Sequence, residues 1–233
     1  MMGAQMVTLR HARGFTLIEL MIAGLLGLIL TAGLIQIFVG TAQTTKVQAA
    51  VSDVQDKGRL AMEFLTREIE NAGFVDDTLL PGGFSTLPVN VDFAVTADGD
   101  TDTLQIQYVG TVDCTGAVIN GVITNTFDVV NGELRCNGQP LVDGVDGFQA
   151  LYGVDSDNDG FVDQYMTATR VVATGSQTRV HSVRISLLIS TLNNVFPRTT
   201  AQTFQLLDAP AVSFNDRRLR RQFTTTVVLQ NRP

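Results

Sequence analysis

Residues 13–20 read Arg-Gly-Phe-Thr-Leu-Ile-Glu-Leu, and they open an apolar run that continues to Val39. Between Phe15 and Val39 the only charged residue is Glu19. An α-helix over these 25 residues would be roughly 37 Å long at 1.5 Å per residue, whereas the hydrocarbon layer of a bilayer is about 30 Å thick. The stretch therefore predicts a membrane-spanning helix near the N-terminus.

The residues around this run predict its orientation and its fate. Arg10, His11 and Arg13 precede it, and no acidic residue occurs before Glu19. Positive charge ahead of a span predicts a cytoplasmic N-terminus and export of everything that follows. A removed secretory signal usually has an apolar stretch of about 7–15 residues followed by small residues. The longer stretch favours a retained anchor here, although composition alone leaves open a cut after the small residues at 40–42.

The charge balance argues against a nucleic-acid binder. The chain has 233 residues and a net charge of −7, from 23 acidic and 16 basic side chains. Binding to a phosphate backbone needs an excess of Lys and Arg, so we expect no nucleic-acid partner. Four arginines do gather between Arg217 and Arg221. We interpret that run as a solvated sheet edge or a contact with acidic groups of another subunit.

The composition also argues against an enzyme. Two His and two Cys would all be needed for one four-ligand zinc site, and His11 precedes the span. The sequence contains no Gly-x-Ser-x-Gly motif, phosphate-binding glycine loop or His cluster. His181 lies in an alternating run, where we expect a structural imidazole. We therefore expect no catalytic site.

A helical period continues beyond the apolar run and then gives way to strands. Apolar residues follow at spacings of three and four or their multiples, at Val47, Val51, Val54, Ala61, Leu65 and Ala72. We predict one helix from Phe15 to Ala72, weakened at Gly58 and ended by Gly73. Alternating or β-branched runs come next, at 104–108, 183–189 and 223–229. The predicted fold is α+β, with a long N-terminal helix whose second half packs against a C-terminal antiparallel β-sheet domain.

The junction at Gly14-Phe15-Thr16-Leu17-Ile18-Glu19 resembles the class III signal of the type IV pilin superfamily. The resemblance implies that a prepilin peptidase cuts between Gly14 and Phe15, methylates the new N-terminus at Phe15 and leaves the apolar helix in place. It also implies that Glu19 pairs with the N-terminal amine of a neighbouring subunit during filament assembly. The expected organisation is a leader at 1–14, a membrane and filament-core half-helix at 15–40, an amphipathic half-helix at 41–73 and a periplasmic β-rich domain at 74–233.

Later segments resemble PilW-type minor pilins, at 132–136, 140–145, 151–155, 183–188 and 217–227. This resemblance implies a structural minor pilin of the type IV pilus that helps to start assembly near the filament tip, in pili of the kind used for twitching motility and adhesion. The implied partners are other minor and major pilins, the prepilin peptidase, the inner-membrane assembly platform and a tip adhesin. The implied location is the inner membrane, then the surface pilus. The alternatives are a J-type pseudopilin of a type II secretion system and a membrane-anchored periplasmic binding protein or enzyme.

Cys114 and Cys136 are the only cysteines, and both follow the span. Export would place them in the oxidising periplasm, where we expect a disulfide rather than two free thiols. Closing a loop of 22 positions would stabilise the fold by roughly 3 kcal/mol in the chain-entropy picture.

Residues 155–163 read Asp-Ser-Asp-Asn-Asp-Gly-Phe-Val-Asp, which matches the first nine positions of an EF-hand calcium loop. Carboxylates fall at positions one, three, five and nine, and a backbone carbonyl at position seven: Asp155, Asp157, Asp159, Asp163 and Phe161. Met166 replaces the bidentate Glu at position twelve, so we expect a hairpin loop that binds Ca²⁺ weakly, at ~10⁻⁴–10⁻³ M, rather than an EF-hand. The alternative is a solvated acidic turn. Asp98, Asp100 and Asp102 repeat the spacing without the glycine, and we expect a turn there.

Overall fold

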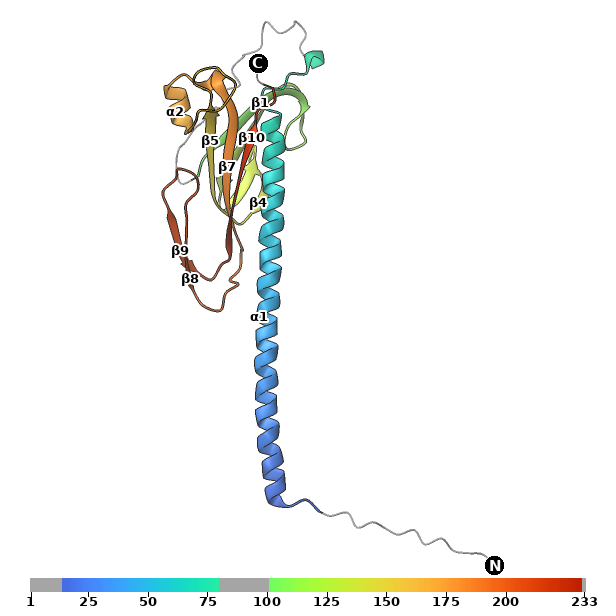
Figure 1. Cartoon of the computed structure of the whole chain (residues 1–233). Helices are drawn as coiled ribbons and strands as arrows, with labels where there is room; N and C mark the ends of the chain where they lie inside the picture. The colour runs from blue at the N-terminus through green and yellow to red at the C-terminus, as the bar shows by residue number, and fades with distance from the viewer. Residues whose placement is uncertain (1–13, 80–100, 232–233) are drawn as a thin grey trace, which may run out of the picture. The chain divides into compact units, whose positions relative to one another are not determined.

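A computed structural model describes residues 14–79 and 101–231 of the chain (Figure 1). Most of the expected leader, at 1–13, lies outside the described residues, as do Asp98 and Asp100 of the second acidic repeat. Residues up to Lys46 and residues from Val47 onward form two compact units.

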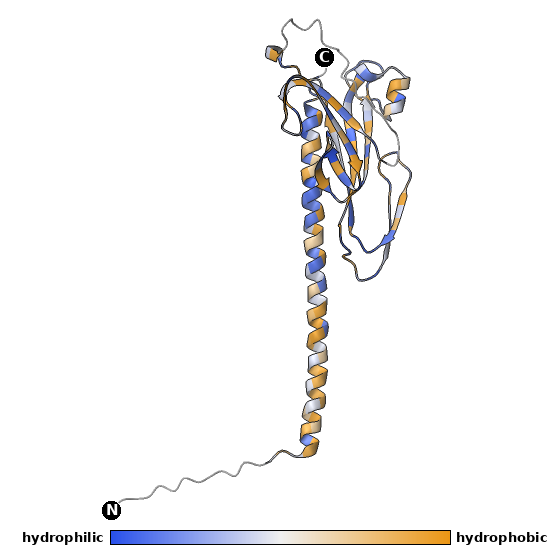
Figure 2. Ribbon diagram, turned by 180° about the vertical axis from the view of Figure 1, so that it is seen from behind, coloured by the Kyte–Doolittle hydropathy of each residue, from blue (hydrophilic) through white to orange (hydrophobic). Residues whose placement is uncertain are grey.

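Helix α1 spans Leu17–Glu70, two residues shorter at each end than predicted. Its end follows from Gly73, which adopts a left-handed φ of 76° that glycine accommodates without strain. Within the first unit the helix is long and apolar enough to cross a membrane. None of its most apolar stretch is buried, and hydrophobic residues predominate along it (Figure 2).

In the second unit, one face of α1 packs against the β-domain. The buried helix residues lie at spacings of three and four: Val54, Gly58, Ala61, Leu65, Glu68 and Ile69. Gly58 was expected only to weaken the helix, but it has a packing role. A Cβ at this position would overlap the ring of Phe223, so the glycine lets the helix approach the strand that carries Phe223. Figure 1 shows strands β10 and β4 beside this part of α1.

Within the described residues, the β-domain contains two four-stranded antiparallel sheets and a separate two-stranded hairpin, whereas the sequence predicted one sheet. The strand orders are β1-β2-β3-β4, β10-β7-β5-β6 and β8-β9. The bounds are β1 Leu104–Val112, β2 Val118–Val130, β3 Glu133–Cys136, β4 Gln139–Asp143, β5 Val145–Val154, β6 Gln164–Met166, β7 Val180–Ser190, β8 Thr200–Phe204, β9 Val212–Asp216 and β10 Arg220–Val228. Short helices are η1 Asp77–Leu79, α2 Ala168–Ala173 and η3 Gln177–Arg179.

Tight turns explain both the first sheet and the change to the second. Asn131-Gly132 joins β2 to β3 and Asn137-Gly138 joins β3 to β4, all four residues with positive φ. Asn-Gly pairs of this kind suit the two-residue turns of β-hairpins. Gly144 (φ 75°) alone separates β4 from β5. A Cβ there would overlap the carbonyl oxygen of Ser190, so a glycine is needed where the chain crosses from one sheet to the other.

Both sheets and the helix share one hydrophobic core. The alternating runs at 104–108 and 183–189 form β1 and β7, as predicted, and their core-facing residues are buried. The largest fully buried side chains are Tyr152, Phe127, Phe148, Leu65, Ile69, Leu104, Ile106, Ile123, Leu134, Ile185, Leu187 and Leu188. The predicted α+β fold, a long apolar N-terminal helix packed on an antiparallel β-domain, is confirmed.

Candidate functional site

The residues expected to flank the processing cut lie just outside α1. Gly14, Phe15 and Thr16 are not helical, and the Phe15 side chain is 83% exposed. The backbone N–H of Glu19 donates a hydrogen bond of 3.3 Å to Thr16 Oγ1. Thr16 thus occupies the N-cap position, and Glu19 supplies the backbone N–H that it caps. This cap was not predicted, although Thr-x-x-Glu ahead of an apolar run is the sequence signal for one.

Glu19 is the one acidic residue in the first turn of α1. Its side chain is exposed, and so are the apolar residues around it, including Leu17, Ile18 and Leu20. A carboxylate near a helix N-terminus interacts favourably with the helix dipole. At the edge of a membrane span it also requires hydration or a cationic partner.

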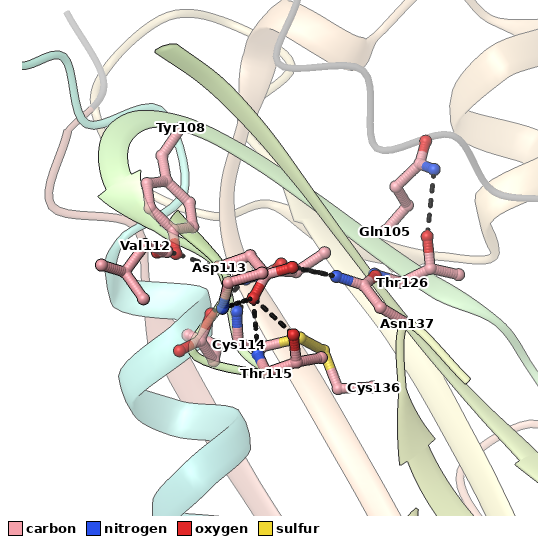
Figure 3. Close-up of a disulfide and its surroundings, with 12 residues drawn as sticks. Gln105, Tyr108, Val112, Asp113, Cys114, Thr115, Thr126, Cys136 and Asn137 are labelled. Carbon is pink, nitrogen blue, oxygen red and sulfur yellow. Dashed lines mark hydrogen bonds between the residues drawn. A yellow bond between two sulfur atoms is a disulfide. The ribbon is translucent and has the colours of Figure 1, made fainter. Parts of the chain in front are cut away.

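The structure joins Cys114 to Cys136 in a disulfide, with the two Cα atoms 6.4 Å apart (Figure 3). Cys136 ends β3 and is fully buried, while Cys114 lies in the turn between β1 and β2. The predicted pairing is therefore present, and it links that turn to β3.

A buried polar network beside the disulfide was not predicted. Asn125 on β2 is fully buried, and its Nδ2 donates to Glu68 Oε2 of α1 at 2.7 Å. Its Oδ1 accepts from the backbone N–H of Cys114 at 3.2 Å and from Asn137 Nδ2 at 3.1 Å. Burial raises the pKa of the Glu68 carboxyl, and the bond from Asn125 offsets only part of that rise. Asn125 thereby connects three segments that are distant in sequence.

The acidic loop brings three of its four predicted carboxylates together. One oxygen from each of Asp155, Asp157 and Asp159 lies within 4.8 Å of the others. Asp163 lies outside that group, and its Oδ2 accepts the backbone N–H of Ser156 at 2.7 Å. The loop connects β5 to β6, two antiparallel strands, as expected for a hairpin rather than an EF-hand.

The three grouped carboxylates have unlike surroundings. Asp155 is buried, and its two oxygens accept the N–H groups of Asn158 and Gly160 at 2.7 Å each. Burial opposes ionisation, but these hydrogen bonds hold the pKa of Asp155 below its usual value. The neighbouring charge of Asp159 instead raises the pKa of Asp157, which is exposed. A bound cation would relieve that repulsion. Phe161, whose carbonyl is the predicted seventh position, has a 74% exposed side chain.

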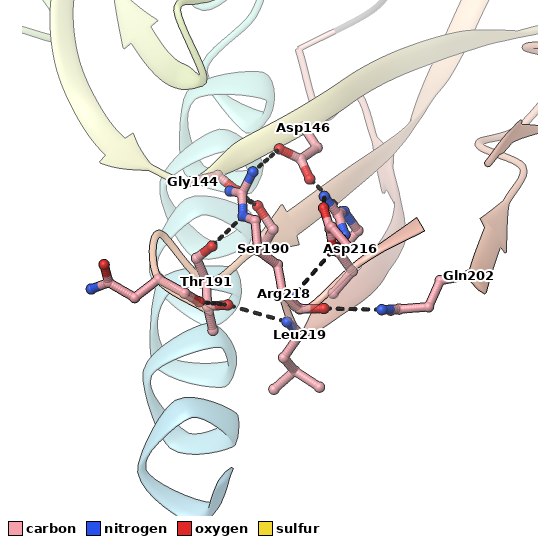
Figure 4. Close-up of polar contacts among 10 residues, drawn as sticks. Gly144, Asp146, Ser190, Thr191, Gln202, Asp216, Arg218 and Leu219 are labelled. Atoms are coloured by element: carbon pink, nitrogen blue, oxygen red, sulfur yellow. Dashed lines mark hydrogen bonds and ion pairs between the residues drawn. The ribbon is translucent and has the colours of Figure 1, made fainter. Parts of the chain in front are cut away.

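The basic run at 217–221 is partly buried within this chain. Arg220 is 5% exposed and makes a two-pronged ion pair with Asp216 at 2.7 Å and a bond to Asp146 at 2.6 Å. Arg218 also lies near Asp146, at 3.6 Å, and bonds to Ser190 (Figure 4). The interpretation of the whole run as a solvated edge was wrong at Arg220, whose acidic partners come from β5 and β9.

Comparisons with known proteins define the class and then the family. The model of the prokaryotic N-terminal methylation motif matches residues 9–35, across the Gly14–Phe15 junction. The model described as type IV pilus-assembly protein W, PilW, matches residues 108–231, more than half of the chain. The protein therefore belongs to the PilW family of type IV pilin-like proteins.

One solved structure with a similar chain path is a type IV-like pilin from Thermus thermophilus. The two sequences are 16% identical, and the TM-score is 0.44. The match covers 76% of this chain and 95% of the other. No curated protein matches the sequence.

Proposed function

We propose that this chain is a structural minor pilin, cut between Gly14 and Phe15, methylated at Phe15 and incorporated into a type IV pilus through α1. The observation that carries the proposal is the intact processing motif at the start of a long apolar helix, in a chain whose β-domain matches the PilW family. The minor-pilin role and a place near the filament tip are part of this proposal, and the resemblance to PilW-type minor pilins supports them.

The local geometry supports processing at this junction. Gly14 and Phe15 are exposed and non-helical, so a peptidase can bind them as extended chain without unwinding α1. Cleavage would remove Arg10 and Arg13 and create an amine four residues before Glu19. In a low-dielectric helix bundle, an amine of one subunit and Glu19 of the next would attract strongly and set the axial register.

Before assembly, we expect the protein to be anchored in the inner membrane with residues 74–233 in the periplasm. The partners that we expect are other pilins, the prepilin peptidase, the assembly platform and a tip adhesin. The exposed apolar half of α1 needs either lipid or other helices around it. No catalytic role is proposed. The competing functions are a J-type pseudopilin of a type II secretion system and a membrane-anchored binding protein or enzyme.

Deletion of the gene separates these functions. We expect few or no surface pili and unchanged type II secretion, with pili restored by the wild-type gene. Lost secretion with normal pili would identify a pseudopilin. Normal pili and normal secretion, together with an uncut N-terminus, would favour the anchored binding protein or enzyme.

We also propose that the acidic loop binds Ca²⁺ through Asp155, Asp157 and Asp159, with Asp163 and the Phe161 carbonyl completing the set. The observation behind it is the convergence of three carboxylates in one turn, one of them buried, with hydrogen bonds that hold its pKa below the usual value. Hard oxygen ligands of this kind suit Ca²⁺, with affinity expected at ~10⁻⁴–10⁻³ M.

Calorimetric titration and thermal melting of the full chain in detergent micelles test this proposal. Millimolar Ca²⁺ should raise the melting temperature of the wild type and of the control variant Asp56→Ala. Asp56 is an exposed residue of α1, far from the acidic loop in sequence. The same Ca²⁺ should have no effect on Asp157→Ala/Asp159→Ala. An equal response in the double variant would place the binding elsewhere.

A further inference from the structure

The sequence contains three Asn-Gly pairs, at 120–121, 131–132 and 137–138, and the structure describes all of them. In such pairs the backbone nitrogen of the glycine can attack the side-chain Cγ of the asparagine. A C–N bond forms, the glycine N–H proton leaves with the amide nitrogen as ammonia, and a cyclic imide results. Water then opens the ring to aspartate or isoaspartate. Glycine favours the reaction because no side chain shields its nitrogen, and water is the only co-reactant.

Two of these pairs form a matched comparison. Asn131 and Asn137 are each the first residue of a two-residue hairpin turn, with φ of 55° and 49°. Both side chains are exposed, so access of water does not distinguish them.

The two carboxamides differ in how they are held. Asn137 Oδ1 accepts the backbone N–H of Thr126 at 2.9 Å, and its Nδ2 donates to Asn125 at 3.1 Å and to Asp113 at 3.3 Å. For Asn131, the described part of the chain shows no side-chain hydrogen bond. Rotation of Asn137 into a reactive position therefore breaks three bonds, while rotation of Asn131 breaks none.

Asn120 resembles Asn131 in this respect. It lies in a β-bulge of β2, between Val118, which pairs with Val112, and Gly121, which pairs with Gly110. Its φ is 51°, it is exposed, and no side-chain hydrogen bond from it occurs within the described ranges 14–79 and 101–231. Backbone at a bulge is less restrained by the strand ladder than backbone within it.

We propose that Asn120 and Asn131 are sites of spontaneous deamidation in the folded protein, and that the hydrogen bonds of Asn137 protect it. Each event adds one negative charge to an acidic domain. At Asn131 the isoaspartate product also lengthens the backbone of a two-residue turn. The carbonyl of Gly132 in that turn accepts the N–H of Val145, the first residue of β5, at 2.9 Å. Deamidation at Asn131 therefore loosens a contact between the two sheets.

Peptide mapping by mass spectrometry tests the proposal on the full chain in detergent micelles, incubated at mildly alkaline pH below its melting temperature. The peptides that contain Asn120 and Asn131 should convert to the acid forms, while the one that contains Asn137 stays an amide. In strong denaturant all three should convert at similar rates, since only the fold distinguishes them. Equal conversion rates at Asn131 and Asn137 in the folded chain would overturn the proposal. Slow conversion of Asn137 in denaturant, relative to the other two, would also overturn it.

A variant examines the cause of the protection. Asp113→Ala removes one of the three bonds to Asn137, and it should speed conversion at Asn137 relative to Asn131 in the same molecules. Asp128→Ala, which removes the partner of Arg135 on the same sheet, is the matched control. It should leave the ratio unchanged. An unchanged ratio in Asp113→Ala would refute protection by these hydrogen bonds.

Discussion

At the start of α1, the neighbouring residues Thr16 and Glu19 have different roles. Thr16 caps the helix through its hydroxyl, and Glu19 supplies the backbone N–H that the cap satisfies. The Glu19 side chain takes no part in that bond, so it stays available for a partner outside the chain. The cap defines where the helix begins, and the carboxylate belongs to the proposed assembly step.

Glu19→Ala should leave export, cleavage and methylation intact but block incorporation into pili. The acid is the only charge in the span, so its removal makes membrane insertion easier, while the proposed pairing with a neighbouring amine is lost. Intact-mass analysis of the membrane fraction should still find N-methylated Phe15. Immunoblots of sheared pili should lack the variant but contain Thr31→Ala, a control in the same span. Normal incorporation of Glu19→Ala would contradict a registering role.

Glu68→Gln should alter how stability depends on pH. Burial raises the pKa of Glu68 above its ordinary 4.5, so the protonated form is favoured by folding. The stability that this provides is fully present below pH 4.5 and is lost as pH rises through the higher folded-state pKa. The substituted glutamine keeps an acceptor for Asn125 without a charge. Denaturant titrations from about pH 4 to about pH 8 should therefore show that the free energy of unfolding of the variant increases relative to that of the wild type as pH rises. Parallel curves would contradict the assignment.

Two features hold secondary-structure elements of this protein close together: a glycine in α1 and the disulfide bond. Gly58 brings α1 against β10, and the disulfide links the β1–β2 turn to β3. Gly58 lies on the part of the helix, from Val47 onward, that belongs to the β-domain unit. Both contacts therefore hold that one unit together.

Gly58→Ala should destabilise the protein, although alanine is the better helix former by about 1 kcal/mol. The added methyl group collides with the Phe223 ring, and the helix must move away from β10. Gly40→Ala, where nothing lies within 4 Å, is the matched control and should not destabilise. A double-mutant cycle with Phe223→Ala checks the cause, because the cost of Gly58→Ala should shrink once the ring is gone.

Removal of the disulfide should cost about 3 kcal/mol of unfolding free energy if the chain-entropy account holds. Cys114→Ala/Cys136→Ala measures that cost in denaturant titrations, with reduced wild-type protein as the comparison. Digestion of wild-type protein without reductant should yield one linked pair of peptides. Complete labelling of both thiols in an unreduced membrane fraction would disprove the bond.

For the molecule as a whole, the cluster of Arg220, Asp146 and Asp216 joins the β8–β9 hairpin to the second sheet. The guanidinium of Arg220 lies 3.8 Å over the ring of Phe214 in β9, while Asp146 belongs to β5. A buried charge with one partner removed is costly, so these contacts tie a peripheral hairpin to the central strands.

This cluster should govern stability in acid. The Arg220 guanidinium lowers the pKa of Asp216 from 3.8 to about 2. The resulting stability is present above pH 3.8 and is lost as pH falls through about 2. The variant Asp216→Asn should not show this loss in acid. Its stability should already be lower than that of the wild type at about pH 5. Melting curves between about pH 2 and pH 6 check this, and an unchanged acid transition in Asp216→Asn would contradict it.

The parts of the fold that depend on local pattern could be predicted from the sequence. The helix bounds, the core-facing alternation in β1 and β7 and the cysteine pairing all follow from short-range spacing or from a small number of candidates. The division into two sheets could not, because it depends on a one-residue connection at Gly144 and on how that residue meets Ser190. The roles of Glu68 and Arg220 depend on partners 57 and 74 positions away, Asn125 and Asp146, and no spacing rule connects them.

The network centred on Asn125 also determines how the domain would bear a mechanical load. Tension along α1 enters the β-domain along the buried helix face from Val54 to Ile69, and at Glu68 the amide of Asn125 passes it to β2, to the backbone of Cys114 and to Asn137. Two of these recipients lie at or beside the cysteines of a covalent crosslink. A pull on the helix is therefore shared by strands that cannot separate at that point. Under force, this end of the β-domain would resist shear as one block, while the β8–β9 hairpin, held by ion pairs and hydrogen bonds, would yield earlier.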